Sequence, residues 1–126
     1  MFNIPKLRGH DTLVRALIDL LFNNGFALIY ADLEGFQKPS LIYWRSSKEG
    51  HIPDVTAFNQ NNIQVIFEIE TEDSISSEHS VSQYNLFSAF VSTHNAIFYL
   101  VVPVGYKNIA MQTLQSNNIT ADVIEI

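Results

Sequence analysis

The stretch Gln64-Val65-Ile66-Phe67-Glu68-Ile69-Glu70 decides how the rest of the chain is interpreted. It is apolar enough for a strand in the middle of a sheet, yet it carries two carboxylates two residues apart. Because side chains alternate between the faces of a strand, Glu68 and Glu70 lie on one face and Phe67 and Ile69 on the other. A buried, ionised carboxylate is costly unless it is paired, hydrogen-bonded or bound to a metal. The stretch therefore predicts a central strand with a site at its end.

A segment before this strand supplies a third carboxylate. Pro53 to Phe58 is predicted as a strand, joined to the strand at residues 64–71 by a hairpin loop at residues 59–62. Folding at this loop brings Asp54 near the level of Glu70 or just beyond it. Three carboxylates then meet at one end of the sheet, and such oxygen ligands suit Mg²⁺ or Mn²⁺.

The flanking segments predict an α/β domain in which helices cover a mixed sheet. Helical spacing of leucines, with Asp11 or Thr12 as the N-cap and Gly25 at the end, predicts a first helix over residues 11–24. A second helix starts at a cap on Ser76 or Ser77 and ends near His94. The buried stripes expected on the two helices are Leu13, Leu17, Leu20 and Leu21, and then Val81, Tyr84, Phe87 and Val91.

The remaining elements complete the order α-β-β-β-β-α-β-α-β. Further strands are expected at residues 26–32, 41–45, 96–104 and 119–126. A third helix is expected at residues 108–116. Residues 46–50 are read as a polar turn. The apolar run at 96–104 follows a helix, so it predicts a buried parallel strand reached by a crossover.

Composition restricts the class of protein. A chain of 126 residues that is 47% hydrophobic predicts one domain, here residues 1–126. The absence of cysteine excludes disulfides, zinc–thiolate sites and thiol catalysis. No signal-peptide core and no membrane-span-length apolar run occurs, so a cytoplasmic protein without a membrane partner is expected.

Charge is distributed unevenly along the chain. Residues 1–50 hold six basic groups against five acids, whereas residues 51–126 hold Lys107 alone against eight acids. The acidic part does not attract nucleic acid, but converging carboxylates attract a divalent cation. The basic residues Lys38, Arg45 and Lys48 surround Tyr43 and Trp44, a combination that either contacts a nucleic-acid backbone or only packs at a sheet edge.

Pro53-Asp54 followed after thirteen residues by Glu68-Ile69-Glu70 resembles the active-site motif of the PD-(D/E)XK nuclease superfamily. The resemblance covers roughly residues 10–104. It implies a restriction-endonuclease-like mixed β-sheet flanked by helices. It also implies Asp54 and Glu68 as metal ligands, with the backbone carbonyl of Ile69 as a further ligand and Mg²⁺ or Mn²⁺ as the cofactor.

This chain departs from the family at one position, because the motif's lysine is replaced by Glu70. Glu70 then serves as the base that activates water or as an extra ligand, or it marks a lost activity. Some branches carry a Gln followed four residues later by an aromatic residue, here Gln83 and Phe87, which implies that Gln83 binds water or phosphate. Asp11 or Asp19 would be the acid that some members add from the first helix.

Three functional hypotheses follow. The first is a nuclease-like hydrolase that cleaves DNA phosphodiesters with Mg²⁺ through Asp54, Glu68 and Glu70, with a homodimer supplying two sites for two strands. The second is a catalytically inactive protein of the same fold that binds DNA or a protein partner as an accessory factor of a mobile element or a defence system. The third treats the acids as surface charge. His51, three residues before Asp54, is either a surface residue or a phosphate contact.

Overall fold

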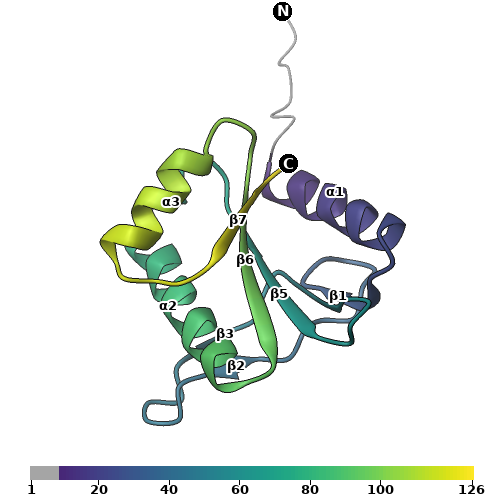
Figure 1. Ribbon diagram of the computed structural model, residues 1–126, viewed down its shortest axis with the longest axis horizontal. Coiled ribbons are helices and arrows are strands. Elements are labelled where there is room, and N and C mark those ends of the chain that lie inside the picture. The colour runs from purple at the N-terminus through teal and green to yellow at the C-terminus, as the bar shows by residue number, and fades with distance from the viewer. Residues whose placement is uncertain (1–8) are drawn as a thin grey trace, which may run out of the picture.

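The computed structural model describes residues 9–126, in which a run of strands between α1 and α2 is followed by alternating helices and strands (Figure 1). Their bounds are α1 His10–Asn23, β1 Ala27–Ala31, β2 Ile42–Tyr43, β3 Gly50–His51, β4 Val55–Phe58, β5 Gln64–Ile69, α2 Glu78–Thr93, β6 Ala96–Val102, α3 Lys107–Ser116 and β7 Asp122–Glu125. The predicted class, a mixed α/β sheet flanked by helices, is confirmed.

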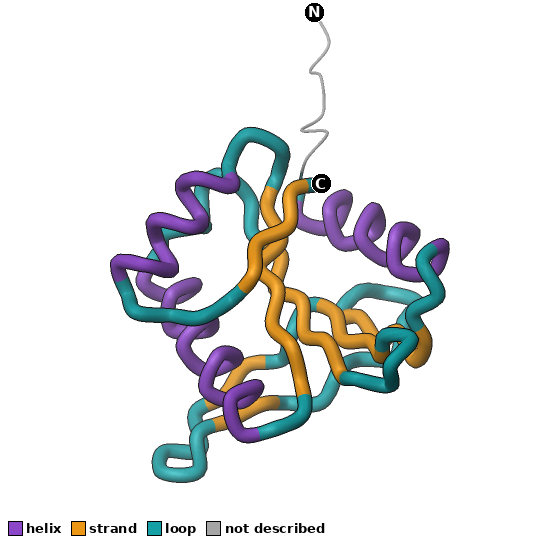
Figure 2. Tube along the Cα trace, viewed as in Figure 1, coloured by secondary structure: helices purple, strands orange, loops and turns teal. Residues whose placement is uncertain are grey.

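A five-stranded sheet with the order β1-β4-β5-β6-β7 runs through the protein (Figure 2). β4 and β5 are antiparallel, as the predicted hairpin requires, and β6 lies parallel to β5 on its other side. β5 is therefore the central strand, and α2 is the crossover that brings the chain back to the parallel strand β6. A second crossover through α3 adds β7 parallel to β6.

The two faces of the sheet have separate cores. Odd-numbered residues of β5, such as Phe67 and Ile69, pack with α1 on one face. Ile66 faces the opposite way and packs with α2 and α3. The alternation predicted for β5 is confirmed, so Glu68 and Glu70 extend toward the side covered by α2. None of the helices in residues 9–126 is long and apolar enough to cross a membrane.

Helix α1 begins one residue earlier than predicted. Its N-cap is Gly9, whose carbonyl accepts a hydrogen bond from the Leu13 N–H, so neither Asp11 nor Thr12 is the cap. Leu20 is 46% exposed, which contradicts its placement in the buried stripe; Val14 and Ile18 are buried instead, because they face the sheet. The helix ends at Asn23 with Asn24 as its C-cap, within one residue of the predicted end.

Gly25, just after α1, has a φ of +79°, a left-handed conformation that glycine adopts without strain. Ser77 is confirmed as the N-cap of α2, since its hydroxyl accepts a hydrogen bond from the Ser80 N–H at 3.1 Å. On α2, Tyr84 and Phe87 are fully buried as predicted, whereas Val81 and Val91 are only half-buried.

The turn predicted at residues 46–50 ends in an additional strand. Gly50 and His51 form β3, which pairs with Tyr43 and Ile42 of β2 in a two-stranded hairpin outside the main sheet. The hairpin is held against the protein by Ile42, which is 8% exposed and packs in the core beneath α2. The strand predicted at 53–58 therefore starts at Val55, because the chain leaves β3 before it enters the main sheet.

The Phe67→Ala variant is expected to lose about 3–5 kcal/mol of unfolding free energy, because it empties a large volume in the core. Phe67 is 1% exposed and its ring stacks on Tyr99 at a centroid distance of 5.6 Å. Denaturation with urea measures the loss. Phe22→Ala is the matched control: Phe22 is 77% exposed, so this variant changes stability by about 0.5 kcal/mol or less. Equal losses in the two variants would contradict the assignment of Phe67 to the core.

Candidate metal centre at the end of the central strand

Asp54 and Glu68 lie side by side at one end of the sheet. In the ladder between β4 and β5, Val55 pairs with Phe67, so Asp54, one residue earlier, lies across from Glu68. The prediction that Asp54 lies level with Glu70 or beyond it is wrong. The hairpin loop is closed by a hydrogen bond from the Asn59 N–H to the Ile63 carbonyl, and this closure sets the register.

Reciprocal hydrogen bonds hold the two carboxylates in place. The backbone N–H of Asp54 donates to Glu68 Oε1 at 3.2 Å, and the backbone N–H of Ile69 donates to Asp54 Oδ2 at 2.8 Å. The Glu68 carboxylate is thus held by the residue opposite it, Asp54. The Asp54 carboxylate is held by Ile69, the residue after Glu68. Because the donors are backbone groups of a sheet, the positions of the two acids are fixed by the fold.

The contact is electrostatically unfavourable when both acids are ionised. Glu68 is only 3% exposed. Burial raises the pKa of Glu68 well above its usual range, and the nearby charge of Asp54 raises it further. Without a cation the raised pKa favours the protonated form of Glu68, whereas a bound cation would compensate the charge and favour the ionised pair.

His10 adds a positive group that the sequence analysis left outside the site. Its Nε2 lies 3.3 Å from Asp54 Oδ2, and its Nδ1 lies 3.4 Å from Asp11 Oδ1. The hydrogen bond to Asp54 raises the pKa of His10 to about 9, although partial burial opposes the rise. The ring is therefore an imidazolium at neutral pH. Nothing in the local sequence indicates this contact, since it arises only when the start of α1 packs beside β4.

Glu70 lies on the same face as Glu68 but faces a different set of donors. Its carboxylate accepts hydrogen bonds from Ser74 Oγ at 2.8 Å and from Ser80 Oγ at 3.0 and 3.1 Å. Glu70 is 6% exposed, and burial raises its pKa while the two hydroxyls oppose the rise. The structure thus brings Asp54 and Glu68 into contact and places Glu70 next to them, hydrogen-bonded to Ser80 of α2 and to Ser74 on the connection before it.

The other candidate residues occupy different positions. Gln83 is half-buried on α2, and its side-chain amide makes no hydrogen bond to another residue in the described part of the chain. Asp11 is exposed and reaches the site only through His10, whereas Asp19 lies about two turns further along α1. The half-buried ring of His51 contacts His79 at a centroid distance of 5.4 Å and Phe87 at 6.5 Å.

Tyr84 is a neighbour of the acids that the sequence analysis assigned only to the core. It is fully buried on α2, and its hydroxyl donates a hydrogen bond to the Ile75 carbonyl at 2.8 Å. Burial raises the pKa of Tyr84, and the nearby Glu70 and Glu68 charges raise it further. Tyr84 therefore stays protonated, as a buried neutral side chain close to the two glutamates.

The donor set fits a hard divalent cation. Across residues 9–126 no three acidic or histidine side chains form a ready-made ligand cluster. Mg²⁺ needs fewer, because it keeps several waters and is bound by one or two carboxylates together with phosphate oxygens. The Asp54–Glu68 pair meets that requirement, and a cation between them would remove the repulsion that raises the pKa of Glu68.

The fold has similarities among solved structures. A repair endonuclease from Pyrococcus abyssi is 17% identical with a TM-score of 0.44, covering 87% of this chain and 45% of that one. EndoMS in complex with double-stranded DNA is 14% identical with a TM-score of 0.43, covering 99% and 48% respectively. EndoMS in its apo form is 14% identical with a TM-score of 0.42, covering 89% of this chain and 46% of that one. The chain spans less than half the length of these proteins. No known protein family and no curated protein matches the sequence.

The Glu68→Gln variant is expected to be more stable than the wild type by about 1 kcal/mol near pH 7 in EDTA. The raised pKa of Glu68 means that ionisation costs folding free energy, and the neutral amide avoids that cost. The wild type binds its proton more tightly when folded, so its deficit shrinks as the pH falls toward about 4. Urea denaturation at several pH values measures both effects.

The control for this prediction is Glu72→Gln, since Glu72 is exposed just beyond the strand. Its stability stays within about 0.5 kcal/mol of the wild type at each pH. Added Mg²⁺ is expected to stabilise the wild type more than Glu68→Gln, because the variant lacks one charged ligand. A Glu68→Gln variant that loses stability near pH 7 would contradict the unfavourable charge assigned to this site.

Proposed function

We propose that this protein is a metal-dependent nuclease that hydrolyses DNA phosphodiester bonds at the Asp54–Glu68 pair. The observation that carries the proposal is the backbone-fixed contact of these two carboxylates at the end of a central strand. Glu68 is buried, and its raised pKa means that its ionised form costs folding free energy. An arrangement that costs stability and is held by the rigid sheet is typical of a functional site.

In this proposal Asp54 and Glu68 hold Mg²⁺ or Mn²⁺, with the Ile69 carbonyl as a further ligand. When bound, the cation neutralises charge on the scissile phosphate and lowers the pKa of a bound water. Asp54 keeps its orientation through the Ile69 N–H, and the His10 imidazolium limits the local excess of negative charge. These residues therefore position the phosphate and the cation.

Glu70 and Gln83 have the proposed auxiliary roles. Glu70 accepts the proton of the attacking water, a role favoured by burial, which raises its pKa and so its affinity for a proton. The hydroxyls of Ser74 and Ser80 orient its carboxylate. Gln83 contacts a water or a phosphate oxygen with its amide. A homodimer of the chain would present two such sites to the two strands of DNA.

Cleavage of a DNA panel tests this function directly. The panel contains supercoiled, linear, single-stranded and branched DNA, each incubated with Mg²⁺, Mn²⁺ or EDTA. The wild type is expected to cut in the presence of metal only. Asp54→Asn and Glu68→Gln are expected to lower the rate at least about 100-fold, because each removes charge that binds the cation at the phosphate.

The control for the cleavage experiment is Glu72→Gln, which removes an equal charge from an exposed position close by and keeps the wild-type rate. Circular dichroism verifies that each variant is folded. Cutting that persists in EDTA, or that survives in both Asp54→Asn and Glu68→Gln, would refute the proposed metal-dependent mechanism.

A second candidate function is a catalytically inactive protein of the same fold that binds DNA or another protein. The observation that favours it is the set of serine hydrogen bonds on Glu70, which occupies the position of the lysine in the motif. Under this alternative the wild type does not cut, and Glu70→Lys gains metal-dependent cutting that the added Asp54→Asn change abolishes. Cutting by the wild type itself would exclude this candidate.

A further inference from the structure

The β2–β3 hairpin and the outer side of α2 form a surface that the proposed catalytic residues do not use. Only Ile42 anchors the hairpin in the core, while its neighbours Tyr43 and Trp44 are 50% and 38% exposed. In Figure 1 the hairpin lies at the lower edge of the protein and its turn points away from the sheet. Two large aromatic side chains are thus presented to solvent on a short, projecting element.

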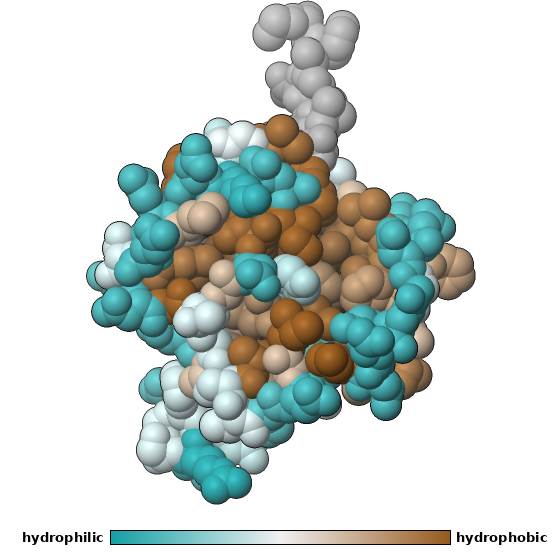
Figure 3. All heavy atoms as spheres, in the orientation of Figure 1, coloured by the Kyte–Doolittle hydropathy of each residue, from teal (hydrophilic) through white to brown (hydrophobic). Residues whose placement is uncertain are grey.

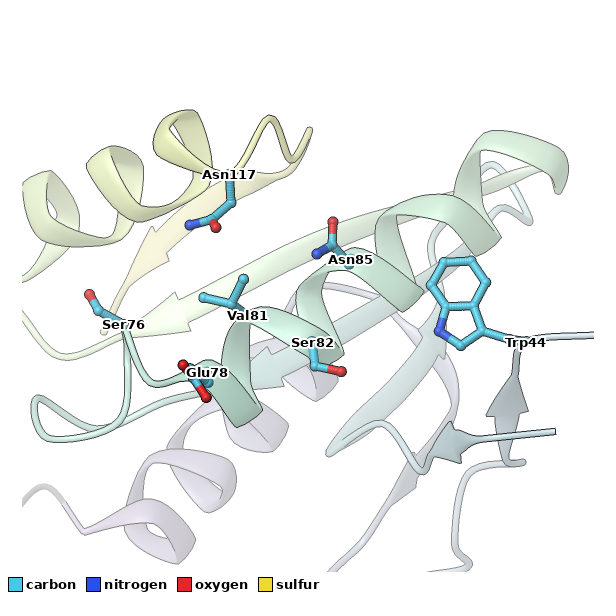
Figure 4. A pocket seen from close by; sticks show the side chains of 7 residues that line it. All are labelled: Trp44, Ser76, Glu78, Val81, Ser82, Asn85 and Asn117. Carbon is cyan, nitrogen blue, oxygen red and sulfur yellow. The ribbon is translucent and has the colours of Figure 1, made fainter. Parts of the chain in front are cut away.

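Trp44 borders two grooves, one on each side of the hairpin's contact with α2. A groove of about 530 Å³ runs along α2 past Ser82 and Asn85 and ends at Ser76 and Glu78 (Figure 4). A second groove of about 560 Å³ lies between the hairpin and the C-terminal half of α2. Their shared wall is an indole, a flat apolar surface that a planar group can cover.

The hairpin turn carries a net positive charge, since Arg45 and Lys48 outnumber Glu49. Neither cation forms an ion pair with any acid in residues 9–126, whereas Lys38 pairs with Asp32 at 3.7 Å. Lys48 Nζ instead lies 5.8 Å from the centre of the Tyr43 ring. Figure 3 shows the hairpin turn at the lower left as a polar projection. Two free cations beside exposed aromatic rings favour an anionic ligand with flat groups.

The groove along α2 indicates what kind of ligand fits. Asn85 and Ser82 are exposed in it and offer hydrogen bonds to the edge of a base. Glu78 at the far end repels phosphate, so the backbone of a bound strand would follow the Arg45 and Lys48 side. A base can stack on an indole only when its face is not covered by neighbours in a duplex, so the fitting ligand is unpaired DNA.

We propose that the hairpin and the outer side of α2 bind unpaired DNA, with a base stacked on Trp44 and adjacent phosphates held by Arg45 and Lys48. This inference rests on the proposed nuclease function, for which it names the form of the substrate. The first groove extends from Trp44 to Ser76, on the connection whose Ser74 bonds to Glu70. The bases of a strand held at the hairpin would lie along this groove, while its phosphates stay on the Arg45 and Lys48 side, away from Glu78.

Intrinsic fluorescence tests the stacking, because Trp44 is the only tryptophan in the chain. A short oligothymidine, titrated in EDTA so that no cleavage occurs, is expected to quench the emission to saturation. The same sequence annealed into a duplex is expected to quench it little. Binding of a labelled oligothymidine, followed by anisotropy, is expected to weaken about 5- to 150-fold in Trp44→Ala.

The charged contacts have their own readout. The double variant Arg45→Gln/Lys48→Gln removes two phosphate contacts, so the slope of log affinity against log salt is expected to decrease by about 1.4. Phe22→Ala and Lys107→Gln are the matched controls, an exposed aromatic on α1 and a cation on α3, and both keep wild-type affinity and slope. Circular dichroism verifies that the variants are folded.

Three outcomes would overturn the inference: no quenching, equal affinity of the wild type and Trp44→Ala, or equal quenching by an acidic polypeptide. The last would identify a protein partner instead. The failure of the proposed nuclease function would be seen separately. If the wild type and Asp54→Asn bind oligothymidine equally well through Trp44, but the wild type does not cut DNA with metal, the protein has this surface and is not a nuclease. A protein that cuts with metal and is unaffected by Trp44→Ala is a nuclease without it.

Discussion

The contact between Asp54 and Glu68 is the interaction around which the described structure is organised. Two carboxylates meet at the end of β5 where Glu68 is nearly excluded from solvent. Such a pair is unfavourable when both acids are ionised. The fold keeps it in place by giving each carboxylate a backbone N–H from the opposite strand. The register of the β4–β5 hairpin is therefore as important for the site as the identity of the two acids.

The surrounding elements limit the cost of that contact without removing it. The start of α1 contributes the His10 imidazolium to Asp54. Glu70 accepts hydrogen bonds from Ser80, in the first turn of α2, and from Ser74, on the connection before it. At the two helix N-termini the peptide dipoles also favour negative charge. None of these donors reaches Glu68, whose raised pKa reflects burial beside Asp54, so a cation bound by the pair would relieve that cost.

Local pattern in the sequence predicts the central strand, the shared face of Glu68 and Glu70, the crossover to β6 and a helix cap at Ser76 or Ser77, because each depends on a few neighbouring residues. The level of Asp54 was misplaced because the register depends on how the Asn59 loop closes, which spacing alone does not determine. His10 was missed because its partner lies on a different element. Leu20 shows the same limit, since helical spacing does not tell which side of an apolar helix faces the sheet.

The uneven charge of the chain gains a structural meaning when the acids and the hairpin are considered together. A negative protein repels DNA at long range, so the binding energy of a nucleic-acid strand has to come from short contacts. Stacking on an exposed indole is such a contact, because it does not depend on net charge. The acidic site then needs a cation before a phosphate can approach it. Arg45 and Lys48 lie in the hairpin turn, on a different element from Asp54, Glu68 and Glu70. Separating the aromatic contact from the carboxylates allows one small, acidic fold to hold a polyanion and still keep the negative pair that a divalent cation requires.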